Sequence, residues 1–195
     1  MDVLRRDVLK TVAASIVAGA TNGVVACANE VGVGDRFPSA KAGHTAMNSR
    51  LLMTVRIAAA PSQKLGTVPH GNRTVVPVTG GHFEGLRLRG EILSGGGDWL
   101  LLRSDNVLEL DLRITLETDD HALIYMTFQG LRHGSPEVIA ALGRGEVVDR
   151  ARYYFRTLPR FETSTESYAF LNRMVTVGVG EARPAGAIHR IYEIL

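Results

Sequence analysis

The sequence predicts an all-β domain, an antiparallel barrel or sandwich, on the strength of three observations. Residues 107–117 read VLELDLRITLE, in which apolar and polar side chains alternate almost without exception. About eight to ten short runs of this kind occur along the chain. Most of them are separated by turn residues such as Gly, Asp and Asn. Side chains alternate between the two faces of a strand and tight turns favour antiparallel neighbours, so the pattern argues against an α/β fold.

Four short strands are expected in the first half of the chain, at residues 51–60, 73–79, 86–93 and 99–103. The second contains Pro77. Proline cannot donate a hydrogen bond to a neighbouring strand, so we expect an edge or a bulge there. The third and fourth strands are separated by Gly95, Gly96 and Gly97, which form a flexible turn.

The clearest element is a hairpin centred on residues 118–120. In the run before it, five apolar side chains fall on one face: Leu108, Leu110, Leu112, Ile114 and Leu116. A helix would spread them around its whole circumference, so a strand with one buried face is the better interpretation. Residues 118–120 read TDD, a sequence that favours a turn. Residues 122–129 read ALIYMTFQ and are expected to form the return strand.

One short helix is expected over residues 136–142. Ser135 is a good N-cap, Pro136 suits the first helical position and Glu137 places an acid in the first turn. Gly143 is a natural end. Residues 145–151 add one more turn, and strands resume at residues 153–158, 173–180 and 187–194.

Length and charge limit the classes of function. The chain has 195 residues, of which 45% are hydrophobic and 22% charged, and its formal net charge is +2. Without a leader, roughly 150 to 170 residues remain, enough for one domain with a substantial core. No basic patch interleaves with stacking aromatic residues, which argues against nucleic acid as a partner. The 6 histidines have no metal-ligand spacing and no nucleotide-binding motif occurs, so neither a metal nor a cofactor is expected.

The amino terminus predicts export. Arg5 and Arg6 open the segment RRDVLK, which resembles a twin-arginine signal, and residues 11–26 are apolar and rich in small side chains. We therefore expect recognition by the twin-arginine export machinery and a periplasmic location. An ordinary amphipathic helix is the alternative. An integral outer-membrane barrel is not expected, because the strands are short and aromatic girdles are missing.

Two cleavage sites compete at the end of this segment. The sequence Ala26-Cys27-Ala28 fits cleavage after Ala28, whereas residues 24–27 resemble a lipobox that would make Cys27 the lipidated first residue. A lipid anchor would then be the protein's attachment to the membrane. Because Cys27 is the sole cysteine, the mature body has no disulfide framework. The expected organisation is an export signal over residues 1–28, a flexible tether over 29–48 and a barrel domain over 49–195.

A series of short motifs resembles one known family. In order they are Gly66 with residues 70–73, then residues 80–85, 96–99, 110–113, 118–120, Gly130, residues 153–157, 161–163, Tyr168 and residues 171–172. From about Arg56 to the C-terminus this set resembles the DUF3237 family, also called UPF0311. The resemblance implies a single closed antiparallel β-barrel of lipocalin-like appearance, and it implies no established reaction. His121 stands where the family usually has glycine, and Phe170 stands where tryptophan is usual.

Candidate site residues come from the polar positions of these motifs. Asp98 and Trp99 either cap a turn and plug one end of the barrel, or supply an acid and an aromatic wall to a pocket. Asp111 and Arg113 share a face and form either a solvated surface pair or an anchor for a substrate acid in a polar lumen. The expected catalytic residues are Asp98, Asp111 and Tyr154. The expected ligand-binding residues are Trp99, Arg113, Arg156, Tyr168 and Asn172.

These residues favour recognition of a polar aromatic molecule over a hydrolytic triad. The first hypothesis is an exported barrel that binds an aromatic or apolar compound bearing a carboxylate or hydroxyl group. The second is a cofactor-independent lyase, isomerase or decarboxylase acting on a small aromatic metabolite in the lumen. The third is a structural envelope protein with a filled barrel. Fold alone does not choose among them.

Overall fold

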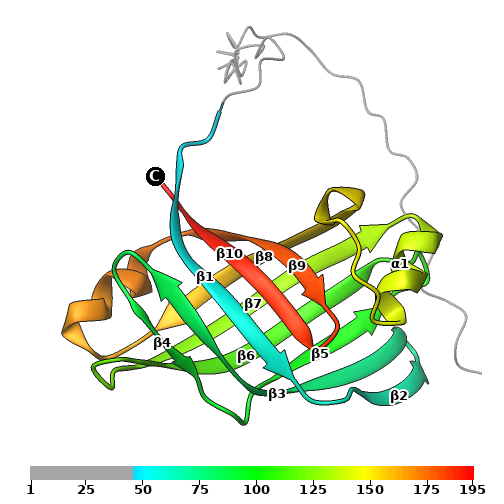
Figure 1. Cartoon of the computed structure of the whole chain (residues 1–195), viewed down its shortest axis with the longest axis horizontal. Coiled ribbons are helices and arrows are strands. Elements are labelled where there is room, and N and C mark those ends of the chain that lie inside the picture. The colour runs from blue at the N-terminus through cyan, green and yellow to red at the C-terminus, as the bar shows by residue number, and fades with distance from the viewer. Residues whose placement is uncertain (1–45) are drawn as a thin grey trace, which may run out of the picture. The chain divides into compact units, whose positions relative to one another are not determined.

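The computed structural model describes residues 46–195, which form one antiparallel sheet of ten strands (Figure 1). The strands are β1 (Ser49–Ala59), β2 (Gln63–Val68), β3 (Gly71–Gly85), β4 (Arg89–Ile92), β5 (Gly97–Leu102), β6 (Leu108–Thr118), β7 (Leu123–Gly134), β8 (Tyr153–Glu162), β9 (Thr176–Arg183) and β10 (Gly186–Ile194). The helical segments are α1 (Pro136–Gly143) and two 3₁₀ segments, η1 (Arg150–Arg152) and η2 (Glu166–Arg173). No helix within residues 46–195 is long and apolar enough to cross a membrane.

The sheet closes on itself because β1 pairs with both β10 and β3. The ring runs from β1 through β10, β9, β8, β7 and β6 to β3, and β4 and β5 share the position between β6 and β3. Counting that shared position once gives eight places around the barrel. The closed antiparallel barrel predicted from the sequence is confirmed.

Strand β3 is long enough to serve two parts of the barrel. Its first half pairs with β2 and β5, and its second half pairs with β1 and β4. The change of partner occurs at Pro77 and Val78, opposite a register shift in β1 between Ala58 and Ala59. The backbone N–H of Ala60 donates to the carbonyl of Pro77 (2.9 Å). The irregularity expected at Pro77 is therefore present, since proline needs a place where the ladder does not require its N–H.

The interior is a packed apolar core. Leu110, Leu112, Ile114 and Leu116 are all at most 5% exposed, as the alternation predicts, while Leu108 at the strand end is only partly buried. They belong to the same core cluster as inward side chains of other strands, such as Phe83 of β3. The polar side chains of β6 consequently face outward, so of the two alternatives for Asp111 the structure favours the outer face over a polar lumen.

Helical segments cover both ends of the barrel (Figure 1). At one end α1 buries Val138, and at the other η2 buries Leu171. Ser135 is the N-cap residue of α1, but its side chain makes no capping hydrogen bond to the backbone. The extra turn expected within residues 145–151 is η1, which begins at Arg150.

Three elements differ from the sequence prediction. Strand β2 was not expected, because its residues are exposed or half-buried and carry no alternating pattern. The strand expected over residues 86–93 is interrupted, since a turn closed by the Gly85 N–H and the Leu88 carbonyl (2.9 Å) precedes β4. Segment η2 occupies residues before β9, which therefore begins at Thr176.

Candidate functional site

A groove of about 750 Å³ lies on the outside of the barrel, across β5, β6, β7 and β8. We call it the outer groove. Its lining includes Arg73, Trp99, Asp111, Leu131, Tyr154 and Arg156. Three of these residues come from strand positions between buried neighbours: Asp111 follows Leu110, and Tyr154 and Arg156 alternate with Tyr153, Phe155 and Thr157. The alternation that buries the core therefore also points the groove residues outward.

Strand register brings these side chains together. Residue Asp111 pairs with Gln129 across β6 and β7, and Leu131 pairs with Arg156 across β7 and β8. Cross-strand partners stand on the same face of a sheet, so side chains from distant parts of the sequence become neighbours. The structure thus gathers four of the predicted site residues, Trp99, Asp111, Tyr154 and Arg156, around one groove.

Two aromatic rings form walls of the outer groove. Trp99 is 40% exposed, and its backbone carbonyl accepts a hydrogen bond from Nη1 of Arg73 (2.9 Å). Tyr154 is held from outside the groove by a stacked contact with His133, whose ring centroid is 4.8 Å away. The guanidinium of Arg156 lies 5.1 Å from the Tyr154 ring. Both rings therefore combine an apolar surface with an adjacent cation.

The charges of the groove are unequally compensated. Asp111 forms an ion pair with Arg113, with 3.2 Å between Oδ2 and Nη2, and Arg113 lies beside the groove lining. Arg156 donates to the carbonyl of Phe155 (3.0 Å). Within residues 46–195, neither Arg73 nor Arg156 forms an ion pair with a carboxylate. The groove thus offers two cations that can receive an acidic group.

Asp98 does not line the groove, although it precedes Trp99. Its side chain lies on the inner face of β5, where Oδ1 accepts the backbone N–H of Asp111 (3.0 Å). Burial raises the pKa of Asp98 to about 7, and the hydrogen bond from Asp111 and the charge of Arg132 oppose that rise only in part. The result is a carboxyl group that exchanges a proton near neutral pH, behind the wall of the groove.

Tyr168 and Asn172 lie elsewhere, on η2. The Tyr168 hydroxyl donates to Oδ1 of Asp120 in the β6–β7 turn (2.9 Å). The Asn172 side chain bridges backbone groups of Thr163, accepting from its N–H (2.9 Å) and donating to its carbonyl (2.8 Å). These contacts fix η2 to the end of the barrel. The structure does not bring Tyr168 or Asn172 to the outer groove. Arg5, Arg6 and Cys27 lie outside the described residues.

Sequence reasoning missed a set of inward polar residues, Arg132 on β7, Thr157 on β8 and His189 on β10. They occupy inner positions of their strands together with Phe128, Phe155 and Ile191. The signal was available, because extending the alternation of residues 122–129 by two steps places Arg132 on the buried face. A charged residue at such a position is rare unless it has a partner or a function.

Comparisons with known proteins agree with this architecture. Residues 47–194 match the family model described as "Protein of unknown function (DUF3237)". UPF0311 protein RPA1785 of Rhodopseudomonas palustris is 30% identical over 149 residues, covering 76% of this chain and 97% of that protein. A UPF0311 protein of Clostridium acetobutylicum is 35% identical over 124 residues, covering 64% and 78% of the two chains.

Solved structures are similar over the same region. The crystal structure of RPA1785 has a TM-score of 0.75 at 30% identity and covers 77% of this chain and 99% of that one. A beta-barrel like protein from Acinetobacter baumannii has a TM-score of 0.66 at 38% identity, covering 78% and 100%. An enzyme from Penicillium herquei, at 18% identity and a TM-score of 0.59 over 77% and 96%, shares the fold. On the family model and these relatives, the chain belongs to the DUF3237 family of β-barrel proteins.

Proposed function

We propose that this protein binds a small aromatic or apolar compound bearing a carboxylate or hydroxyl group, and that the outer groove is the site. The observation that carries the proposal is the convergence of Trp99, Tyr154 and Arg156 on one groove of about 750 Å³. That volume lies within the range of roughly 300 to 1,000 Å³ that small-molecule sites occupy.

The groove chemistry supports this class of ligand. The rings of Trp99 and Tyr154 offer flat surfaces against which an aromatic ligand can stack. Arg73 and Arg156 offer guanidinium groups for a carboxylate, and these pair well with planar acids because they donate two parallel hydrogen bonds. Leu131 is 41% exposed and supplies apolar contact between them.

The test compares two arginines on the same strand. Arg156→Met removes the guanidinium but keeps most of the side-chain volume, and Arg160→Met makes the same change at an exposed position of β8 outside the groove. Aromatic acids, beginning with 2-naphthoate and 4-hydroxybenzoate, are screened by thermal shift and titrated by calorimetry. We expect Arg156→Met to weaken binding by about 1.5 to 3 kcal/mol, the range for a charged hydrogen bond, and Arg160→Met to leave it unchanged. Equal affinity in both variants would remove the groove from consideration.

A second function, cofactor-independent acid–base catalysis on a small aromatic metabolite, rests on one observation. The pKa of Asp98, raised to about 7 by burial, suits proton transfer at neutral pH. Asp98 faces the interior, however, and the two acids that line the groove, Asp111 and Glu109, are paired with Arg113 and Arg103. Binding is therefore the better proposal for the groove, and catalysis would require a substrate that reaches the inner face of β5.

We also propose that the chain is exported through the twin-arginine route and acts in the periplasm. Support comes from the segment containing Arg5 and Arg6 ahead of an apolar stretch, and from the position of Cys27 at its end.

A further inference from the structure

Beneath α1, the barrel interior holds polar groups whose hydrogen bonds are not made. Thr157 and His189 are each 1% exposed. Across residues 46–195, no group hydrogen-bonds to Oγ1 of Thr157, Nδ1 of His189 or Nε of Arg132, and all three atoms are buried. Unpaired buried polar atoms are costly and rare in native proteins. Three of them, on β7, β8 and β10 of the same end of the barrel, indicate a place that can receive a polar ligand.

The three side chains are arranged around one aromatic ring. The Arg132 guanidinium lies 5.6 Å from the ring centroid of Phe155, and the His189 ring lies 5.1 Å from it, edge to face. The His189 ring also contacts Phe128, at 4.8 Å between centroids. Thr157 follows Phe155 by two residues on the same inward face of β8. The polar atoms therefore adjoin two apolar rings.

The charge of this interior is unbalanced. Within the described residues Arg132 has no ion pair, although it influences Asp98, Tyr153 and His189 electrostatically. Burial, with the neighbouring guanidinium, lowers the pKa of His189 to about 4, so its imidazole is neutral at pH 7. The Tyr153 hydroxyl already accepts the backbone N–H of Ala182 (3.0 Å). Asp98 is partly protonated at neutral pH, which leaves much of the Arg132 charge uncompensated.

We propose that the α1 end of the barrel interior is a second binding site, on the other face of the sheet from the outer groove, that takes a small organic carboxylate. Thr157 borders both sites, and its buried Oγ1 belongs to the interior one. Arg132 binds the carboxylate, Thr157 and His189 satisfy its remaining hydrogen bonds, and Phe128 and Phe155 contact the apolar part. A carboxylate supplies both the missing negative charge and the missing hydrogen-bond acceptors. A water molecule could form the hydrogen bonds but would not balance the charge of Arg132.

Access is from the end that α1 covers. Arg132 and Asp98 both keep partial exposure, so solvent reaches the inner face of β5 and β7 here. Val138 is the one residue of α1 that is fully buried.

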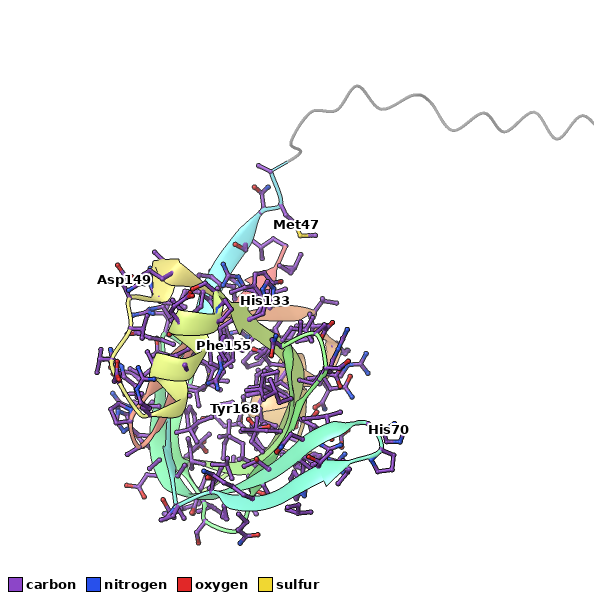
Figure 2. All side chains as sticks on the ribbon, turned by 90° about the vertical axis from the view of Figure 1, so that its right-hand side faces the viewer. Met47, His70, His133, Asp149, Phe155 and Tyr168 are labelled. Atoms are coloured by element: carbon purple, nitrogen blue, oxygen red, sulfur yellow. The ribbon has the colours of Figure 1, made fainter. Side chains whose placement is uncertain are left out.

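 Gly145, just beyond α1, has a left-handed φ of 80°. A left-handed glycine at that point lets the chain turn away after the helix. Figure 2, which looks along the barrel from this end, shows Phe155 within the ring of strands beside α1.

The test uses benzoate as the probe, benzamide as its uncharged counterpart, and the imidazole NMR signals of the full chain as the readout. The His189 signals are assigned by their loss in His189→Gln. We expect benzoate to shift them saturably and benzamide to leave them in place. Arg132→Met should weaken benzoate binding by about ten- to a hundredfold, the range for a charged hydrogen bond. Arg160→Met, the same change on the barrel surface, should have no effect.

The same titration separates this site from the outer groove. Arg156→Met should leave the His189 response unchanged even where it abolishes binding in the groove, so either proposal can fail alone. A wild-type chain whose His189 signals ignore benzoate, or respond equally to benzamide, would overturn the interior site. So would an unaltered affinity in folded Arg132→Met. Should that variant fail to fold, Thr157→Val keeps the side-chain shape and must lower the affinity several-fold; unchanged binding there would equally count against the site.

Discussion

Asp98 and Trp99 are neighbours in the sequence and face opposite sides of the barrel wall. Trp99 lines the outer groove, while the Asp98 carboxyl accepts the N–H of Asp111 from the inner side. The ladder between β5 and β6 is regular at Asp98 and again from Leu101, but it is open at the residues between them. The Asp98 side chain thus replaces a backbone acceptor at the gap, which explains why an acid is tolerated at a largely buried position.

The raised pKa of Asp98 predicts how the free energy of unfolding depends on pH. Its folded pKa is about 7 and its unfolded value is roughly 3.9, so folding favours the protonated form. The contribution of Asp98 to stability is therefore fully present below about pH 4 and is lost as the pH rises to 7. Asp98→Asn keeps an oxygen acceptor for the Asp111 N–H and cannot ionise. We expect the variant to exceed the wild type by up to about 4 kcal/mol at pH 8, with the gap closing towards pH 4.

Chemical denaturation of both proteins from pH 4 to pH 8 checks this prediction. His189 has a pKa lowered to about 4, so its own contribution is present above pH 6.5 and is lost as the pH falls. That loss occurs in both proteins and cancels in their difference. A stability difference that stays constant with pH would show that folding does not change the protonation of Asp98.

The structure shows the surroundings of the two residues that depart from the family pattern, His121 and Phe170. His121 has a φ of 62°, the left-handed region that glycine enters most easily, and its Nδ1 lies 2.9 Å from Oε1 of Glu117. The side-chain contact accompanies a conformation that a histidine adopts rarely. Phe170 lies beneath the guanidinium of Arg87, 3.4 Å from its ring centroid, and does not line the outer groove.

Among the secondary-structure elements, strands with alternating apolar and polar residues were the easiest to predict. Strands β6 and β8 each bury one face and expose the other, so their positions and their outward residues could be predicted. Strand β2 and segment η2 could not, because neither has a period that a core imposes. Which face of the polar strands would meet a concavity also could not be predicted, since this depends on how the sheet closes and on cross-strand register.

Strand β9 shows how register limits side-chain size. A Cβ added to Gly180 would lie 2.5 Å from the ring of Phe155, whereas one added to Gly143 at the end of α1 would meet nothing within 4 Å. We expect Gly180→Ala to destabilise the fold by about 1 to 3 kcal/mol, the usual cost of overpacking a core. Gly143→Ala, the matched control, should be neutral or slightly stabilising. Urea denaturation measures both, and an unperturbed Gly180→Ala would show that the Phe155 ring has room to move.

At the level of the whole molecule, one closed sheet separates two chemical environments. The inner face holds the apolar core and, near α1, the Arg132 cluster, while the outer face carries the groove. Closure leaves few unpaired strand edges, and Thr157 places the two proposed sites on opposite faces of β8. The same wall of sheet therefore borders both sites. The hydrogen bond from the Asp111 N–H to the Asp98 carboxyl lies within this wall and links a residue of the groove to a residue of the interior.

Export concerns the whole chain, and the amino-terminal sequence makes it testable. Arg5 and Arg6 precede the apolar stretch, so replacing both with lysine should keep the protein uncleaved in the cytoplasm, because the twin-arginine machinery requires the pair. Cell fractionation and the mass of the mature chain measure the outcome. The matched control is a double substitution of Arg89 and Arg103 by lysine, on the exposed surface of the barrel domain. Periplasmic delivery of the Arg5→Lys, Arg6→Lys chain would contradict the twin-arginine interpretation, and labelling with a radioactive fatty acid would show whether Cys27 is lipidated or removed with the signal.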